Sequence, residues 1–556
     1  MEIKKQPIIG CVMVALLTIL LGCAPESDVT PVVEQPTNAI PTFVLETTAT
    51  LVPEKTVEPS ATSTIEPASP TAEPSATPVD TATLTVTVTK TSTSTPTSTP
   101  TTTATATATA TLTPTATATL TSTPSNTPTP TLTPVPLSST DTSLPVPQLA
   151  YTHQQADGNR FVRGNGVLPF VQSFDVQLEM IPLWVVGAPL ANGNSLWVVS
   201  LANGEVQSFE ASPNGIIARP DLVFETPPAG SPLTLRTDSD PPSLVTVPEE
   251  AGPSFYTHPI PLRNAGRYAL ITRQNDFRVW EGSSWQGFPI KPLPDARILT
   301  DQNERLLFLS DPTDMYRHDV LGDVIEAKSI TLIETAPTPR IVSTIQVPDE
   351  RVIEGVAPIW TDLNGDGQRE ILVTESDVFE GSRLVLFSEA GERLAEGPAV
   401  GQGYAWRHQI AAARFGPNGE TEIAAVLTPH LGGIIEYYSW QGDKLEIVAQ
   451  VPGYSSHVIS SRNLDMSVAG DFDNDNRIEL LIPTWDRKQL VGIRRTVEIS
   501  DEVIRGAEVV WSIPLGGEEE DRHRLSTNIG SVSWPDGRMG IGIGREDGLL
   551  RVWVPR

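Results

Sequence analysis

The sequence predicts an all-β protein, a seven-bladed β-propeller preceded by a disordered Thr/Pro-rich stalk. After about residue 148, short runs rich in β-branched and aromatic residues are separated by Gly, Asp, Asn and Pro, and no convincing helical pattern interrupts them. The runs recur every roughly 50–60 residues, which is too long for a thin solenoid and typical of propeller blades. Before them, Thr, Pro, Ser and Ala dominate, and such a composition cannot form a core.

Residues 1–22 are predicted to be a signal peptide. Lys4 and Lys5 precede an apolar run, residues 8–21, that is short for a membrane span. The run ends in Leu-Leu-Gly followed by Cys23, which resembles the lipobox of bacterial lipoproteins. That resemblance implies cleavage before Cys23, lipidation of its thiol and anchoring in the membrane. The alternative is an ordinary signal peptide with a chance cysteine.

Residues 23–148 are predicted to form the lipidated start and the stalk. The frequent prolines favour an extended chain of about 3.1 Å per residue, so the stalk could reach on the order of 300 Å. We therefore expect an extracytoplasmic protein, lipid-anchored to the cell membrane or cell surface. Ala24 gives no Asp-type retention signal, so the membrane that carries the anchor stays open, as does glycosylation of the stalk.

The acidic composition limits the possible partners. The formal net charge is −29, which repels phosphate and argues against nucleic acid. We expect the folded domain, residues 149–556, to bind an extracellular protein or carbohydrate. Oligomeric state is not determined by the sequence.

The loops that begin each repeat give the predicted blade count. The markers are Asn192, Ser239, Asp301, Asp362, Gly416, Asp471 and Asp536. Seven markers predict seven blades, with six or eight as alternatives. The last repeat ends after two strands, so we expect an N-terminal strand, FVRGNGVLPF from Phe161, to complete the final blade.

Two of these loops carry a dense pattern of oxygen-bearing side chains. Positions 1, 3, 5 and 9 are polar or acidic, position 7 can offer a carbonyl, and together such groups suit Ca²⁺. The predicted ligands are Asp362, Asn364, Asp366, the carbonyl of Gln368 and Glu370 in the first loop, and Asp471, Asp473, Asp475, the carbonyl of Arg477 and Glu479 in the second. Position 6, Gly367 or Asn476, should have a positive φ. The alternative is a pair of tight Asp/Asn/Gly turns without metal.

These loops exclude an EF-hand and resemble another family. An EF-hand needs Glu at position 12, where Val373 and Ile482 stand, and it needs flanking helices. The loops resemble the calcium loops of FG-GAP (VCBS-type) repeats, the blades of the integrin α-subunit propeller. The resemblance implies a propeller with structural Ca²⁺ between the first two strands of a blade.

Three other marker loops depart from this pattern. The loop at Gly416 lacks the first Asp, the loop at Asp301 carries Arg305 at a ligand position, and Asp536 stands in a short turn. We expect no metal in these loops, so two calcium sites are predicted in all.

No catalytic motif is evident in the sequence, and its seven His have no zinc-type spacing. Segments between repeats nevertheless share aromatic and His residues that could line a ligand-binding face. These candidates are Tyr404, Trp406, His408, Tyr454 and His457. The alternative is that they are inherited packing residues.

The leading hypothesis is a cell-surface, non-enzymatic binding or adhesion module stabilised by calcium. An extracellular enzyme acting on polysaccharide is the second hypothesis, and it would need clustered carboxylates or a Tyr/His/Arg set. A scaffold or assembly protein of the envelope is the third, because the NGEV and AGER hairpins resemble those of PQQ-like propellers.

Overall fold

The computed structural model describes residues 149–556 apart from 229, 263–265, 282–283, 498–505 and 517–521. The predicted signal peptide, Cys23 and the stalk lie outside the described residues. The described chain is all-β, with one short 3₁₀ helix, η1 (Glu249–Ala251). Within the described residues, no helix has the length and apolar character needed to cross a membrane.

The strands form antiparallel groups that follow one another along the chain. The first groups are β4 (Pro182–Pro189), β5 (Ser195–Leu201), β6 (Val206–Ser212) and β7 (Gly215–Ala218); β1 (Leu149–Tyr151), β8 (Thr234–Arg236) and β9 (Ser243–Leu244); and β10 (Ile260–Pro261), β11 (Arg267–Ile271), β12 (Phe277–Glu281) and β13 (Trp285–Gly287). The middle groups are β14 (Leu299–Thr300), β15 (Leu306–Thr313), β16 (Glu326–Glu334) and β17 (Arg340–Gln346); β19 (Ile359–Thr361), β20 (Glu370–Asp377), β21 (Gly381–Ser388) and β22 (Arg393–Glu396); and β23 (Arg407–Ala413), β24 (Glu422–Leu427), β25 (Ile434–Gln441) and β26 (Lys444–Pro452). The short strand β18 (Val352–Ile353) links β16 to β20.

Besides the group of β1, two further groups recruit strands from the N-terminal part of the domain. They are β2 (Phe161–Asn165), β27 (Val468–Asp471), β28 (Glu479–Pro483), β29 (Gln489–Arg495) and β30 (Ala507–Pro514); and β3 (Ser173–Gln177), β33 (Leu549–Trp553), β32 (Met539–Arg545) and β31 (Gly530–Ser533). The strand that completes the last group is β3, which pairs antiparallel with β33. The prediction that the segment from Phe161 would do so is wrong, because β2 instead pairs parallel with the inner strand β27.

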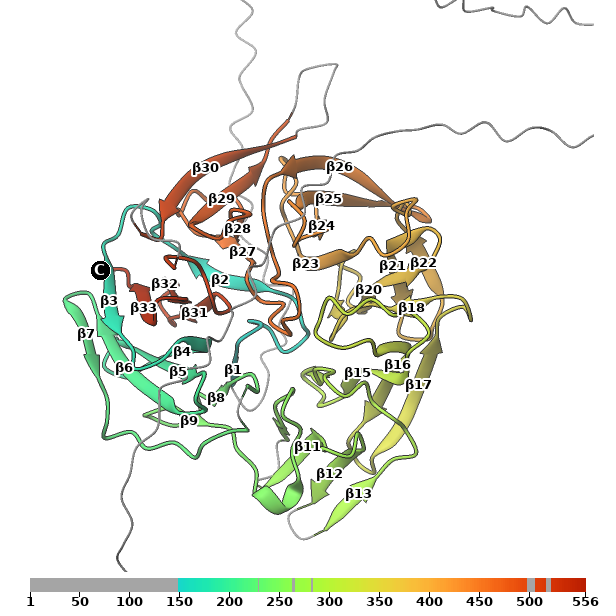
Figure 1. The fold of residues 1–556 in the computed structure, drawn as a ribbon, viewed down its shortest axis with the longest axis horizontal. Coiled ribbons are helices and arrows are strands. Elements are labelled where there is room, and N and C mark those ends of the chain that lie inside the picture. Colours follow the sequence, from blue (N-terminus) through green and yellow to red (C-terminus); the bar gives the residue numbers. More distant parts are fainter. Residues whose placement is uncertain (1–148, 229, 263–265, 282–283, 498–505, 517–521) are drawn as a thin grey trace, which may run out of the picture. The chain divides into compact units, whose positions relative to one another are not determined.

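The groups are arranged around a common centre, as in a β-propeller, with β17, β26 and β30 at the periphery (Figure 1). Burial follows this arrangement: every residue of the inner strand β23 is buried, whereas most of the outer strand β17 is exposed. Apolar side chains from neighbouring groups pack between the sheets, for example Val185 and Trp197 against Val532. The core is therefore a series of layers between adjacent groups of strands.

Six of the seven marker loops lie where the repeat predicted them, between the first two strands of a group, whereas Ser239 lies between β8 and β9, the second and third strands of its group. The loop between β10 and β11 contains no marker, although it also joins the first two strands of a group. It lies in the sequence between the markers Ser239 and Asp301. The marker count therefore does not fix the number of blades.

The N-terminal segment threads through the centre of the arrangement. The carbonyls of Ala156, Asp157 and Arg160 accept hydrogen bonds from the first strands of three different groups, at Thr300 (2.9 Å), Trp360 (2.9 Å) and Ala469 (2.8 Å) respectively. The side chain of Asn159 bonds both backbone groups of Ala412 in a fourth. These contacts explain why β2 ends beside β27 rather than at the outer edge.

Candidate metal centre

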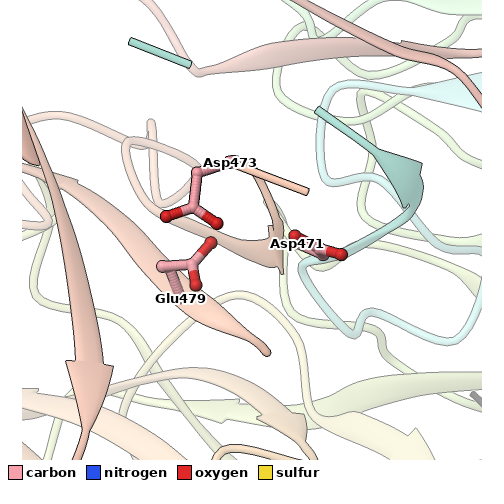
Figure 2. Close-up of side chains that lie close together, drawn as sticks. All are labelled: Asp471, Asp473 and Glu479. Atoms are coloured by element: carbon pink, nitrogen blue, oxygen red, sulfur yellow. The ribbon is translucent and has the colours of Figure 1, made fainter. Parts of the chain in front are cut away.

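The second acidic loop joins β27 to β28 and brings three carboxyl groups together. Asp471 ends β27, Glu479 begins β28, and Asp473 lies between them. One oxygen from each lies within 4.8 Å of the others (Figure 2). Asp471 and Glu479 are buried, and Asp473 is half-buried. Across the part of the chain that the structure describes, no other group of acidic, His or Cys side chains meets this criterion.

Glu479 is the most constrained of the three. Its Oε2 accepts a hydrogen bond from the N–H of Phe472 at 2.9 Å, whereas its buried Oε1 has no partner among the described residues. Burial above all, and then the nearby charges of Asp473 and Asp475, raise the pKa of Glu479 to about 9. A buried carboxylate oxygen without a donor is costly, and a bound cation would supply the missing partner.

Burial also raises the pKa of the other two carboxyl groups. It raises the pKa of Asp471 to about 6, although the N–H of Asn476 opposes the shift. The pKa of Asp473 is also raised, first by burial and then by Asp475. The group therefore resists ionisation unless a positive charge is placed next to it.

Hydrogen bonds within the loop fix its backbone conformation without a ligand. The carboxylate of Asp471 accepts the N–H groups of Asp475 and Asn476, both at 3.1 Å, and Asp475 accepts that of Arg477 at 3.0 Å. Asn476 has φ +65°, which confirms the prediction for position 6. Asn474, at position 4, also has φ +65°; its Asn was the signal that could have predicted this.

Asp475 has a cationic partner from the next strand. The guanidinium of Arg494 in β29 bonds the carboxylate of Asp475 and also Glu508 at 3.1 Å. This arginine was not foreseen, because it lies outside the loop in sequence. The assignment of the Arg477 carbonyl as a ligand stays a prediction.

The first acidic loop has the same backbone pattern. The carboxylate of Asp362 accepts the N–H groups of Gly365 (2.6 Å) and Gly367 (2.9 Å). These glycines have φ of +79° and +85°, at positions 4 and 6. Glu370 accepts the N–H of Leu363 at 2.8 Å, as Glu479 does from Phe472.

The side chains of the first loop nevertheless pair differently. The amide nitrogen of Asn364 donates to Asp366 at 3.2 Å and to Glu370 at 3.3 Å. Its oxygen accepts the N–H of Asp366, which fixes the orientation of the amide. The carbonyl of Gln368 stays a predicted ligand, since the contact found is its N–H donating to Asp366 at 2.7 Å.

A cavity of about 450 Å³ lies between the two loops. Asp362 and Asp471 both line it, and β2 and the loop after β23 contribute Arg163 and Arg414. The backbone carbonyl of Asp471 also holds the N–H of Gly166 at 2.7 Å, just after β2. Sequence reasoning missed this cavity because β2 reaches it from more than 300 residues away in the chain.

The predicted ligand-face residues lie elsewhere, and most are buried. Trp406 stacks on His408 with ring centroids 5.1 Å apart and meets His457 edge-on at 5.0 Å. Tyr454 packs in the apolar cluster with Tyr437 and Ile482. These four side chains occupy the interior of the fold, as the packing alternative describes.

Tyr404 is the exposed member of the predicted ligand face, at 49%. Its ring stacks on Tyr316 with centroids 5.1 Å apart and meets His318 edge-on at 5.7 Å. Its φ of +58° is unusual for a bulky residue and positions the ring at the surface.

Two of the three marker loops expected to lack a metal hold an internal ion pair. Arg305 Nε lies 2.7 Å from Asp301, as expected for a positive charge at a ligand position. Arg538 Nε lies 2.8 Å from Asp536. In these two loops an arginine pairs directly with the first acid of the loop, whereas Asp471 in the second acidic loop accepts backbone N–H groups.

No known protein family matches the chain, and no curated protein does. Among solved structures, the crystal structure of BamB from Moraxella catarrhalis is similar at 10% identity and a TM-score of 0.32, covering 71% of this chain and 97% of that chain. A similarity of that size supports no conclusion about function.

Proposed function

We propose that the chain is a lipid-anchored, calcium-binding β-propeller that acts at the cell surface as a non-enzymatic binding or adhesion module. The main support for calcium binding is the buried Oε1 of Glu479, which has no hydrogen-bond partner among the described residues and lies beside Asp471 and Asp473. Bound Ca²⁺ would neutralise the carboxylates and stiffen the loop. Lipidation of Cys23 and the stalk, residues 23–148, rest on the sequence alone.

The chemistry of the donors fits a hard cation. Asp471, Asp473 and Glu479 offer carboxylate oxygens, and Asp475 is a fourth acid in the same loop. Carboxylate oxygens suit Ca²⁺, and the group contains no Cys or His that would favour a softer metal. In the first loop, Asn364 would have to give up two hydrogen bonds, so calcium binding should be weaker there.

The ligand of the module is proposed to bind in the cavity between the loops. Its volume of about 450 Å³ lies in the range of small-molecule sites, and its lining is mixed in polarity. Calcium would act on this cavity indirectly, because Asp471 both belongs to the proposed site and holds the backbone of Gly166. A saccharide unit or an extended peptide segment is a ligand of suitable size.

Thermal unfolding of the full chain with Ca²⁺ and with EDTA tests the metal site. Calcium stabilises by RT ln(1 + [L]/Kd), about 2.7 kcal/mol at a hundredfold excess over Kd. The double variant Asp366→Ala, Asp475→Ala should lose this gain, whereas Asp536→Ala, in a loop with its own arginine, should keep it. If EDTA leaves the wild-type transition unchanged, the loops are ordinary turns and a scaffold role is favoured.

Binding to arrays of glycans and extracellular peptides, with and without Ca²⁺, tests the module. Thr421 is exposed and lines the cavity, so Thr421→Trp should fill the space without disturbing the core. We expect calcium-dependent binding that this variant loses. Binding that survives the substitution would place the ligand elsewhere.

A second candidate function, an enzyme acting on polysaccharide, is favoured by one observation. His318 Nδ1 lies 2.5 Å from Oε1 of the fully buried Glu354, whose Oε2 accepts from Ser376 Oγ at 2.5 Å. Tyr316 and the exposed Tyr404 lie beside the imidazole. A carboxylate that orients an imidazole beside tyrosines is a plausible acid–base arrangement.

Release of reducing ends from a polysaccharide panel tests this second candidate. The wild-type chain should release them and His318→Asn should not. His430→Asn, in a neighbouring loop, is the matched control. Equal results from all three chains would remove the enzymatic candidate.

A further inference from the structure

The centre of the fold contains a buried group of charges that does not sum to zero. The carboxylate of Asp465 accepts hydrogen bonds from Arg160 Nε at 2.8 Å and from both terminal nitrogens of Arg297 at 2.8 and 2.6 Å. All three side chains are at most 4% exposed. Two guanidinium groups against one carboxylate leave a net charge of +1, and an uncompensated buried charge is strongly unfavourable.

Beside these charges lies a cluster of aromatic and imidazole rings. The ring of His153 lies 4.8 Å from that of Tyr151 and 5.6 Å from that of His258. The charges of Arg297, Asp465 and Arg160 all act on His153, which places the rings next to the ion group. His153 is fully buried and His258 is 3% exposed.

The polar atoms of this cluster lack partners among the described residues. Both ring nitrogens of His153, Nε2 of His258 and the hydroxyl of Tyr151 are buried without a hydrogen bond. Buried polar groups are nearly always satisfied, so several orphans in one place indicate an occupant. The imidazoles do not add to the positive charge, because burial lowers the pKa of His258 to about 4 and that of His153 well below its ordinary value.

A cavity of about 180 Å³ reaches the cluster from one side. His258 lines it together with Thr234 and Thr257, whose buried hydroxyls are also unpartnered within the described chain. Glu225 and Glu249 line the same cavity, and their carboxylates repel a multiply charged anion more strongly than a monovalent one. The cavity gives a small ion a route to the rings.

We infer that the centre of the fold binds one small monovalent anion of halide type, held by the excess charge of Arg160 and Arg297, by an N–H of His153 and by the O–H of Tyr151. Water could satisfy the donors but would not compensate the net charge. This site is independent of the proposed calcium site and fastens the N-terminal segment that carries Tyr151, His153 and Arg160 to the strands around it.

Crystals of the full chain soaked in bromide test the inference directly. An anomalous peak in contact with the ring of His153 and the hydroxyl of Tyr151 is expected. Density for water alone at that place would overturn the proposal.

A second test measures the melting temperature of the full chain at increasing chloride concentration. Gluconate replaces chloride at the lower concentrations, so that the ionic strength stays constant. The wild type should become more stable with each tenfold increase in chloride, as expected for a bound ion. His153→Phe keeps the ring but removes its donors and should lose the response, whereas His430→Phe should keep it. An equal response in all three chains would show a general salt effect and contradict the site. If His153→Phe does not fold, the bromide experiment decides alone.

Discussion

The two acidic loops have nearly the same backbone but different electrostatics, and position 3 makes the difference. In the first loop, Asn364 donates its neutral amide to Asp366 and Glu370, so two of the acids have a hydrogen-bond donor within the loop. In the second loop, Asp473 cannot donate, and Oε1 of Glu479 stays without a partner. A change of one functional group thus distinguishes a loop whose acids are hydrogen-bonded internally from the loop in which we propose a cation.

The largest expected effect is that of Glu479→Gln. It should remove most of the calcium stabilisation, about 2.7 kcal/mol at a hundredfold excess over Kd, because a ligand and its charge are lost. In EDTA the substitution should change the free energy of unfolding much less, because Glu479, with its pKa raised to about 9, is already protonated at neutral pH. Calcium titrations followed by thermal unfolding measure both values. Glu370→Gln is the matched control in the first loop; an equal loss there would contradict the comparison.

The next effect is a pH dependence that calcium should suppress. The pKa of Glu479 rises from 4.5 in the unfolded chain to about 9 in the folded protein. The folded state therefore binds more protons, and stability in EDTA should fall as the pH rises from about 4.5 to about 9. Bound calcium holds the deprotonated form and should flatten this slope. Melting temperatures across the range check it, and the slope in EDTA should be shallower in Glu479→Gln.

A smaller effect is expected from Asp473→Asn, which gives the second loop the position-3 residue of the first. The new amide can donate to Glu479, so the apo loop should be stabilised while calcium affinity falls about tenfold, or about 1.4 kcal/mol. Calorimetric titration measures the affinity. An unchanged affinity would mean that position 3 does not distinguish the loops.

The smallest effect is expected from the reverse change, Asn364→Asp. It removes two donated hydrogen bonds and adds a charge, so the apo protein should be slightly less stable and the calcium response slightly larger. Because Asn364 is exposed whereas Asp473 is half-buried, screening by solvent should keep both changes below those in the second loop. Differential scanning calorimetry with and without Ca²⁺ checks the sign. If Asn364→Asp gained more calcium stabilisation than Asp473→Asn lost, the expected order of the two effects would be reversed.

Sequence reasoning predicted local features well because short-range physics controls them. The strand-forming runs, the place of the marker loops and the positive φ of Gly367 and Asn476 follow from residue type and spacing. It failed where a distant segment decides the outcome. The segment from Phe161 pairs with β27 instead of completing the last group. The burial of Trp406 and His408 also depends on contacts that no local signal shows, and their role in ligand binding stays a prediction.

By itself, the sequence determined the all-β class, the repeat and the oxygen-rich pattern of the two loops, since each depends on neighbouring residues. Only the tertiary structure decided that β3 completes the last group of strands, that β2 and residues 152–160 fill the centre, and that Arg494 reaches Asp475. It also decided that Arg160 and Arg297 share Asp465. These contacts join segments more than a hundred residues apart in most cases, and their energies depend on burial and desolvation, which exist only after the chain has folded.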